Sequence, residues 1–320
     1  EYLARERKAA YKSEYYRASR AAFDTYGNVV SATDPLNHSV SNTYDTATRT
    51  FVTKVENPLG HTSTMAYDAR YNAVIAATDA AGVSTTNEYD SLGRLSRVIG
   101  PNDTRDLPTT RFEYDVSTVP TRATQYVRLQ HGGASELVTH TFFDGLNRPI
   151  QVRSPAENVA QQIVTAVKEF DARGFVARQW APYLDAASSV YRPWTMVGGV
   201  ASPAVYDYDA LGRLVSTTQP NGSQDTTAFS DWAVTSVDAN GHQVRRVRDA
   251  HGQLVTVEEY EGLAPGATLY ATTTYAYDAR GNMVRLTDAK GNVTTTVYDS
   301  LGQAHSVSLY FTKTGDGVYE

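Results

Sequence analysis

The chain alternates short stretches of hydrophobic and polar residues with turn-forming positions at a nearly constant spacing. Within the stretches, β-branched and apolar residues alternate with polar ones, as in residues 213–218 and 282–287. An alternation with period two predicts half-buried β-strands, here of roughly seven residues each. We therefore expect an all-β chain of antiparallel β-hairpin repeats. The turn positions of its first part fall at Asp24, Asp34, Asp45, Asn57, Asp68, Asp79 and Asp90.

A tetrad, Asp-x-x-Gly, marks most of these turns. The side chain of Asp at the first position of a type I turn accepts a hydrogen bond from the backbone two residues on. Gly at the fourth position takes the positive φ that a bulged hairpin turn requires. The tetrads predict structural repeat turns at Asp24 with Gly27, Asp79 with Gly82, Asp90 with Gly93, Asp171 with Gly174, Asp209 with Gly212, Asp238 with Gly241, Asp249 with Gly252, Asp278 with Gly281, Asp288 with Gly291, and Asp299 with Gly302.

The turns fall into two alternating classes. An aromatic residue precedes the Asp of one class, as at Tyr89, Tyr208, Tyr277 and Tyr298, whereas Thr precedes it in the other, as at Thr78 and Thr287. Because consecutive turns of a meander lie at opposite edges, we expect the aromatic class at one edge of the ribbon and the threonine class at the other.

The repeat divides the chain into three parts. Residues 1–22 are expected to form a linker or a short helix, residues 23–303 the repeat strip, and residues 304–320 a terminal strand or tail. Residues 181–204, rich in Pro and Gly, predict an irregular insertion in the strip. The aromatic residues in or beside it, Trp180, Tyr183, Tyr191 and Trp194, are expected to pin that loop to the sheet.

Composition narrows the function. The net charge of −6 is dispersed, whereas a nucleic-acid partner would require a basic face. The chain contains no cysteine, which excludes disulfides and a thiolate nucleophile. No segment has the ~20 consecutive apolar residues of a membrane helix. No signal-peptide apolar region is recognised, and the lack of disulfides fits a cytosolic protein as well as a large secreted bacterial protein.

The repeat units closely resemble the YD repeats of the Rhs family, over nearly the whole chain. The resemblance implies a β-strip that spirals into a hollow shell and encloses a toxic C-terminal polypeptide. The implied partners are the rest of the shell, that polypeptide and other subunits of a toxin complex. The implied localisation is that of a secreted or cell-surface bacterial protein, of which this chain is a fragment without its own signal peptide. The segment 142–183 also resembles the B components of bacterial insecticidal toxin complexes. The units that carry the resemblance are Tyr89-Asp90-Ser91-Leu92-Gly93-Arg94, Tyr208-Asp209-Ala210-Leu211-Gly212-Arg213, Tyr277-Asp278-Ala279-Arg280-Gly281-Asn282 and Phe143-Asp144-Gly145-Leu146-Asn147-Arg148.

Catalytic residues, metal ligands and cofactor-binding motifs are not predicted. The histidines lack metal-ligand spacing, and His38, His61 and His242 read as solvated flanks of turns. The family's autoproteolytic segment has no counterpart, since Asp34-Pro35 continues as an ordinary repeat turn. A carboxylate in every hairpin indicates turn formation, because a catalytic pair is needed only once.

Two other functions stay open. The Tyr-rich turns at one edge are also compatible with a module that binds carbohydrate or a cell surface, because aromatic rings stack on sugars. A hydrolase on a β-propeller or β-helix would need carboxylates clustered in a cleft. A row of exposed rings at Tyr89, Tyr208, Tyr277 and Tyr298 would favour the first of these alternatives, and rings buried against neighbouring strands would favour the structural role.

Overall fold

The computed structural model describes residues 2–8 and 15–311, with side chains from residue 19 onward. Apart from the short 3-10 helix η1, its regular elements are strands, so the predicted all-β class is confirmed. The strands are β1 Tyr2–Lys8, β2 Tyr15–Phe23, β3 Val29–Thr33, β4 Ser39–Tyr44, β5 Val52–Glu56, β6 Thr62–Asp68, β7 Ala73–Thr78, β8 Ser84–Tyr89, β9 Leu95–Ile99, β10 Thr110–Asp115, β11 Thr121–Arg128, β12 Glu136–Phe143, β13 Pro149–Pro155, β14 Gln161–Thr165, β15 Lys168–Phe170, β16 Val176–Gln179, β17 Tyr183–Ala186, β18 Ala204–Tyr208, β19 Leu214–Thr218, β20 Gln224–Ser230, β21 Ala233–Val237, β22 Gln243–Arg248, β23 Leu254–Glu261, β24 Thr268–Tyr277, β25 Met283–Thr287, β26 Val293–Tyr298 and β27 Ala304–Tyr310, and η1 is Trp194–Met196.

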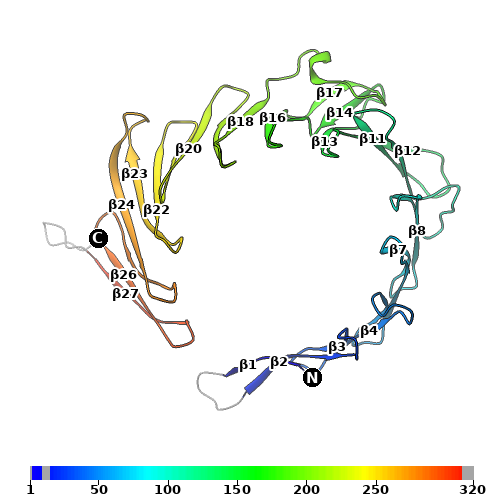
Figure 1. Cartoon of the computed structure of the whole chain (residues 1–320), viewed down its shortest axis with the longest axis horizontal. Helices are drawn as coiled ribbons and strands as arrows, with labels where there is room; N and C mark the ends of the chain where they lie inside the picture. The colour runs from blue at the N-terminus through cyan, green and yellow to red at the C-terminus, as the bar shows by residue number, and fades with distance from the viewer. Residues whose placement is uncertain (1, 9–14, 312–320) are drawn as a thin grey trace. The chain divides into compact units, whose positions relative to one another are not determined.

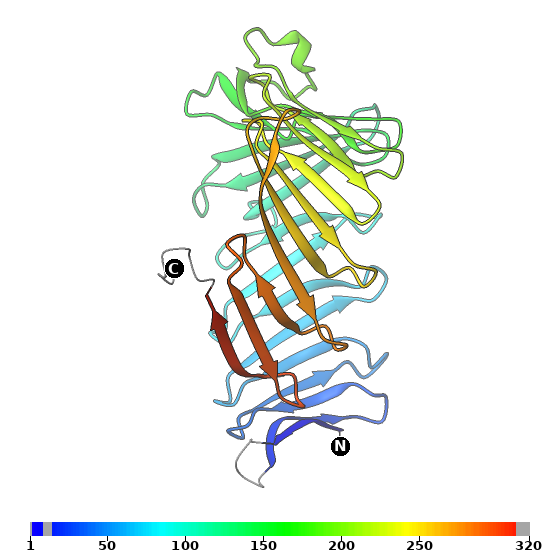
Figure 2. The same cartoon turned by 90° about the vertical axis from the view of Figure 1, so that its left-hand side faces the viewer.

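The strands form two sheets. A 15-stranded sheet runs in chain order from β1 to β14 and ends on β17, and a 12-stranded sheet runs through β15, β16 and β18 to β27. Strands that follow one another in this order lie side by side in both sheets (Figures 1 and 2). The chain divides into two compact units, of which unit 1 comprises Glu1–Val164 and Leu184–Tyr191, and unit 2 comprises Thr165–Tyr183 and Arg192–Glu320.

Two expectations about the parts of the chain need correction. Residues 2–8 and 15–22 are strands, not a linker or short helix, and β1 pairs with β2 in an antiparallel ladder. The single strip expected over residues 23–303 is two sheets. Ala166, with φ of 55°, takes the chain out of strand geometry just after β14, and β17 occupies the place beside that strand.

The remaining expectations concern irregular segments. Residues 181–204 contain β17 and η1 and otherwise run irregularly up to the first residue of β18. Within unit 2, the ring of Trp194 lies 4.8 Å from that of Trp180, and within unit 1 Tyr191 packs edge-on against Phe142 at 5.7 Å. The end of the chain contains β27, whereas residues 312–320 of the expected tail lie outside the described residues.

All ten tetrads lie in turns of one geometry. The Gly N–H donates to the Asp carbonyl at 2.9–3.2 Å. The Asp N–H donates to the carbonyl of the fifth residue, as from Asp209 to Arg213 at 3.0 Å. Each Gly has φ between 77° and 91°. These are the bonds of a type I turn closed by a residue in the left-handed region, which is the bulged hairpin turn that the sequence predicts.

At some of these turns glycine is also needed because an aromatic ring lies where a Cβ would be. A Cβ on Gly212 would lie 2.6 Å from the Phe175 ring, which itself stacks on Tyr208 at 4.9 Å. A Cβ on Gly93 would meet the Tyr71 ring at the same distance, and the Tyr71 hydroxyl is bonded to the carbonyl of Ser91. Each of these turns therefore receives an aromatic ring from the preceding turn of its edge.

Buried apolar residues are few. In the described part of the chain they are Phe142, Val164, Val167, Trp180, Ala233 and Ala271. Most strand residues are only half-buried. A strip of this kind depends on contacts between neighbouring hairpins rather than on one large core.

A turn glycine is required for its positive φ and, at some turns, for the space that it leaves for a neighbouring ring. Gly222 meets only the first requirement, whereas Gly212 meets both. Gly222 has φ of 85°, and no other group lies within 4 Å of the point that a Cβ would occupy, so Gly222→Ala should cost only the left-handed strain of about 1–2 kcal/mol. Gly212→Ala should cost roughly 1–3 kcal/mol more, because the stacked Phe175 ring must also move. Urea unfolding of the two variants measures the difference, and equal losses would contradict the ring-receiving role of Gly212.

Candidate functional site

The turn carboxylates are occupied by backbone donors. In each of the ten tetrads Asp Oδ1 accepts N–H bonds from the third and fifth residues at 2.8–2.9 Å. Asn57 makes the same two bonds with its amide oxygen. The structure thus spreads the predicted Asp residues over separate turns and gives each of them a turn-closing role in place of a shared site.

The second carboxylate oxygen of several turn aspartates binds the side chain of the fifth turn residue, at both edges. At the aromatic edge Asp90 and Asp209 pair with Arg94 and Arg213 at 2.7 Å, and Asp278 accepts from the Asn282 side chain at 2.9 Å. At the threonine edge Asp34 pairs with His38 at 2.9 Å, and Asp288 accepts from the Asn292 side chain at 2.9 Å. His242 pairs with Asp238 in the same way at 3.0 Å. Both histidine side chains are well exposed, as expected for turn flanks.

These bonds favour the charged form of the turn carboxylates. The backbone N–H of Arg213 holds the pKa of the Asp209 carboxyl below its ordinary value against partial desolvation, and the Arg213 guanidinium acts in the same direction. The pKa of Asp278 is lowered by the Asn282 side chain and backbone. A carboxyl with a lowered pKa cannot serve as a proton donor near neutral pH.

The tyrosines of the aromatic edge tie one hairpin to the next. The ladder between β25 and β26 ends at Arg285 paired with Thr295, so the Met283 carbonyl lies beyond it. The Tyr298 hydroxyl donates to this carbonyl at 3.1 Å. The same bond recurs from Tyr89 to Val74 at 3.0 Å, Tyr208 to Val176 at 3.1 Å and Tyr277 to Leu254 at 2.9 Å, and also from Tyr44 to Val29 and Tyr114 to Leu95.

A register shift accompanies this arrangement. The hairpin of β24 and β25 pairs Tyr277 with Met283 but Ala276 with Arg285, so one residue of the exit strand is extra. The hairpins β8–β9, β18–β19 and β26–β27 shift in the same way, whereas β3–β4, β7–β8 and β25–β26 at the threonine edge pair without a shift. Such bulges increase local twist and interrupt the ladder. The four predicted tyrosines are half-buried beside them.

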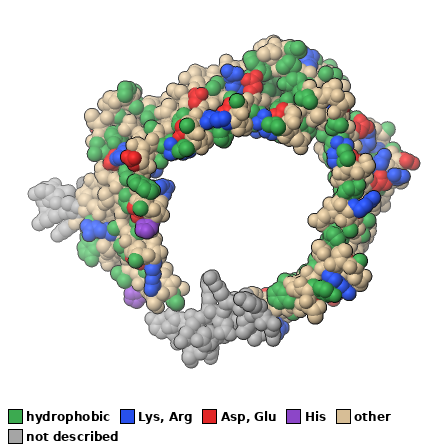
Figure 3. All heavy atoms as spheres, viewed as in Figure 1, with side chains coloured by type: hydrophobic (Ala, Val, Ile, Leu, Met, Phe, Trp, Pro, Cys, Tyr) green, Lys and Arg blue, Asp and Glu red, His purple; other side chains and the backbone are tan. Residues whose placement is uncertain are grey.

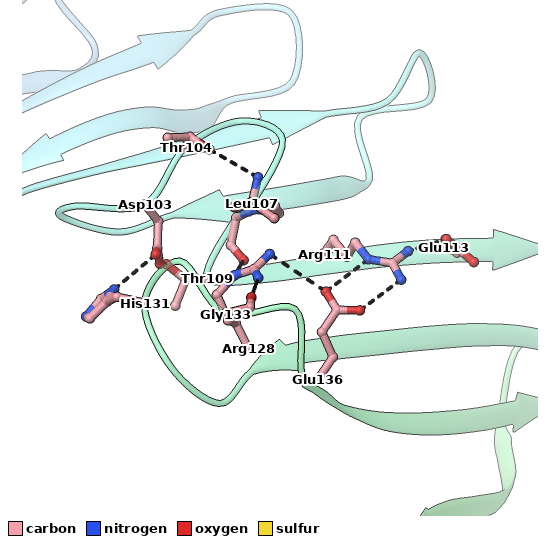
Figure 4. Close-up of polar contacts among 11 residues, drawn as sticks. Asp103, Thr104, Leu107, Thr109, Arg111, Glu113, Arg128, His131, Gly133 and Glu136 are labelled. Atoms are coloured by element: carbon pink, nitrogen blue, oxygen red, sulfur yellow. Dashed lines mark hydrogen bonds and ion pairs between the residues drawn. The ribbon is translucent and has the colours of Figure 1, made fainter.

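A polar network joins two loops at the threonine edge of unit 1 (Figure 4). The side chain of Asp103 is 1% exposed and accepts bonds from Thr109 at 2.5 Å and from His131 at 3.0 Å. These two donors hold the pKa of Asp103 below its ordinary value. The carboxylate lies between hydroxyl and imidazole, whereas a nucleophilic triad places the imidazole in the middle. The group therefore fastens residues 100–109 to the loop that follows β11.

Arginines extend this network along the strands. Arg128 donates to the Pro108 carbonyl at 2.9 Å and to the Gly133 carbonyl. Arg111 pairs with Glu136 at 3.0 Å and lies 3.3 Å from the centre of the Tyr126 ring. Acidic and basic side chains also lie next to each other over the face seen in Figure 3.

A second polar cluster lies in unit 1, at residues that were not predicted. Gln151 and Arg153 on β13 are fully buried, and Arg153 pairs with Asp185 of β17 at 2.8 Å. Arg153 Nε also donates to Gln162 of β14 at 2.9 Å. Alternating polar residues on β13 read equally well as a solvated face, so sequence pattern alone could not separate the two cases.

The described residues show neither a cluster that could bind a metal ion nor a helix that could span a membrane. None of their His, Asp and Glu side chains form a group of three or more that could hold a metal ion. Over the same residues, no helix has the length and apolar character for a membrane span.

The lowered pKa values of the turn carboxylates make the stability of the fold depend on pH in the acid range. A carboxyl whose pKa is lowered by folding stabilises the fold above its unfolded value, which is 3.8 for Asp, and loses that contribution as pH falls through the folded value. Asp209→Asn with Asp278→Asn should keep the amide-accepting bonds, as Asn57 does, and flatten the loss of stability below about pH 4. Urea midpoints measured against pH give the slope. Asp209→Ala is the control, since it should lower stability at every pH; an unchanged acid slope in the Asn variant would contradict the assignment.

Sequence and structure comparisons place this geometry among known proteins. A family model described as RHS Repeat matches residues 271–294, which contain the Tyr277-Asp278 turn, β25 and the Asp288 turn. A model described as Flagellar basal body protein FlaE D2 domain matches residues 286–320 and overlaps the first. In the described part of that stretch, β26 and β27 form one more aromatic-edge hairpin. No curated protein sequence is a significant match.

Solved structures match over most of the chain. The crystal structure of TcdB2-TccC3 matches 92% of this chain and 19% of its own, with 16% identity and a TM-score of 0.69. TcdB2-TccC3-Cdc42 matches 94% of this chain and 23% of its own, with 13% identity and a TM-score of 0.67. A Photorhabdus luminescens Tc holotoxin pore with a mutation in TccC3 matches 96% of this chain and 23% of its own, with 13% identity and a TM-score of 0.64.

The chain thus spans about one fifth of the length of the solved chains that it matches. At these identities the likeness concerns the fold. The resemblance predicted from the tetrads is confirmed: the chain carries an RHS repeat, and its hairpin sheets have the fold of the solved TcdB2-TccC3 chains.

Proposed function

We propose that this chain is a length of wall in a toxin-associated shell that encloses a toxic polypeptide, with no catalysis of its own. The observation that carries the proposal is the tyrosine bond between successive hairpins, as from Tyr298 to Met283. It uses the most distinctive residues of the repeat to hold one hairpin on the next. The fold shared with TcdB2-TccC3 chains supports the same role.

The chemistry of the turns also supports a structural role. Their carboxylates accept backbone N–H bonds and pair with arginine or histidine, as at Asp90 and Asp34. Few lone pairs stay available for acid–base work or for metal ligation. In this proposal the partners are the rest of the shell, the enclosed polypeptide and other toxin-complex subunits, and the protein is secreted or displayed at the bacterial surface.

Binding of carbohydrate by the tyrosine turns is the weaker alternative. It requires exposed ring faces at Tyr89, Tyr208, Tyr277 and Tyr298, whereas these residues are half-buried and their hydroxyls donate to neighbouring strands. A ring fixed by its hydroxyl in this way can still stack on a sugar with its outer edge only. The structural role accounts for both the ring and the hydroxyl.

Limited proteolysis of the native polypeptide that contains this chain, purified from its own cells, tests the proposal. We expect a fragment outside the repeat strip to resist protease while the strip is intact and to be cut rapidly once the strip is opened with urea. Equal cleavage of that fragment in both states would overturn the proposal. So would a native polypeptide that contains only the strip, or binding to a glycan array that Tyr277→Phe and Tyr298→Phe abolish.

A further inference from the structure

The last strand of the first sheet comes from a short segment whose flanks belong elsewhere. Residues 184–191, here called the strap, belong to unit 1, whereas the segments on both sides of it, Thr165–Tyr183 and Arg192–Glu320, belong to unit 2. The strap contributes most of β17, which lies beside β14 and ends the sheet. Its outward side chains Leu184 and Val190 are 55% and 65% exposed. Retention of the strap therefore depends on its inward contacts.

Those inward contacts are mostly polar, and Arg153 makes several of them, while Arg122 donates to the Ser189 carbonyl and the Ala187 N–H donates to the Ala160 carbonyl at 2.9 Å. Arg153 pairs with Asp185 at 2.8 Å and donates to the Ala186 carbonyl at 2.7 Å. Gln162 accepts from the Ser188 N–H at 3.0 Å and from Arg153 Nε at 2.9 Å. Arg153 is 0% exposed, so its charge is compensated only while the strap is in place. A buried ion pair is costly to break because it leaves one charge unpaired.

A buried histidine lies directly beside this arginine. His140 on β12 is 7% exposed and is the cross-strand partner of Arg153 on β13 and of Thr124 on β11. Its Nδ1 lies 3.0 Å from Thr124 Oγ1. The ring also lies 6.4 Å from that of Phe142, against which Tyr191 of the strap packs. The histidine is therefore the cross-strand neighbour of the ion-paired arginine and lies near the aromatic ring that supports the strap.

The charged groups around His140 are unbalanced toward the positive. The elements packed against it carry Arg122 on β11, Arg153 on β13 and Asp185 on β17, with Glu113 and Asp115 on β10 and Tyr191 on the strap. Asp185 pairs with Arg153, and Glu113 pairs with Arg111 and accepts from Tyr126. Asp115 approaches Arg122 only to 3.5 Å. A proton on His140 would add a third cation where one acidic group is buried.

We infer that the strap is an acid-released latch, in which protonation of His140 beside Arg153 and Arg122 loosens the buried cluster and frees residues 184–191 from the sheet. One proton is taken up, and the charge that drives release is the imidazolium. The open strap exposes His140 and Arg153 to water, where both cations are hydrated. Release leaves the edge of β14 without its neighbour.

The direction of the pH dependence follows from burial. Burial, and then Arg122 and Arg153, lower the pKa of His140 in the closed state. The open state, with an ordinary histidine, binds the proton more tightly, so acid favours opening. The open population should rise up to about tenfold for each pH unit below the ordinary histidine value of 6.5. The turn carboxylates stay charged in this range, because their pKa values are lowered from 3.8.

Two spin labels on the full chain measure the opening. The sequence has no cysteine, so Ile163→Cys on β14 and Val190→Cys on the strap give a unique label pair at partly exposed positions. We expect one short distance at about pH 7.5 and a second, longer population that grows toward about pH 5, which brackets the titration of histidine. A label pair at Leu129 and Leu137, which flank the loop between β11 and β12, should show one distance at both pH values.

Variants at two histidines assign the switch. His140→Gln keeps a polar side chain that can bond to Thr124 but cannot titrate, and it should abolish the long-distance population. His131→Gln, at a histidine whose side chain is 65% exposed, should leave the acid opening unchanged. A wild-type chain that keeps one distance at both pH values overturns the inference even if His140→Gln fails to fold. Acid opening that persists in a folded His140→Gln chain overturns it as well.

Discussion

A meander of hairpins stays one sheet only if each hairpin is held to the next, and at the aromatic edge the backbone ladder does not reach far enough. The bulge beside most aromatic turns adds one residue to the exit strand and stops the ladder short, as at Arg285 and Thr295, whereas the Tyr114 hairpin pairs without a shift. The tyrosine hydroxyl then donates to the carbonyl that is left over. The twist that the bulge introduces and the bond that compensates for it are two parts of one device.

The turns at the ends of the strands also hold each hairpin in place. Their Asp carboxylate orders the loop by accepting two N–H bonds, and their Gly provides the left-handed residue. At Gly212 the missing side chain also makes room for Phe175 from the previous turn of the edge. Contacts of this kind join nearest neighbours along the sheet. They explain how a chain with few fully buried residues can form long sheets.

The sequence predicts those features of the fold that are local and periodic, namely the hairpin turns and the two kinds of edge. The tetrads give the hairpin turns, and the alternating aromatic and threonine classes give the two edges, because turn chemistry is written in four adjacent residues. The N-terminal strands were missed, since a charged segment such as residues 1–22 has no clear period. The division into two sheets could not be foreseen either, because it depends on Ala166 in a left-handed conformation and on the return of β17 to β14.

The two buried polar clusters could not be predicted from the sequence for a related reason. Arg153 and Asp185 are 32 residues apart, and only the return of the strap brings them together. Likewise Asp103 and His131 meet across two loops of irregular length. Their residue types are ordinary for exposed strand faces and loops. What distinguishes them is burial, which a single sequence shows only where a periodic pattern is present.

Tyrosine hydroxyls, and not only backbone ladders, hold successive hairpins together. Unfolding in urea of Tyr277→Phe and Tyr298→Phe, compared with Tyr270→Phe at a side chain that is 75% exposed, tests this role most directly. Each of the first two variants should lose about 1 kcal/mol of stability, because a carbonyl loses its donor, and Tyr270→Phe should lose almost none. Equal stability of all three variants and the wild-type chain would contradict the account.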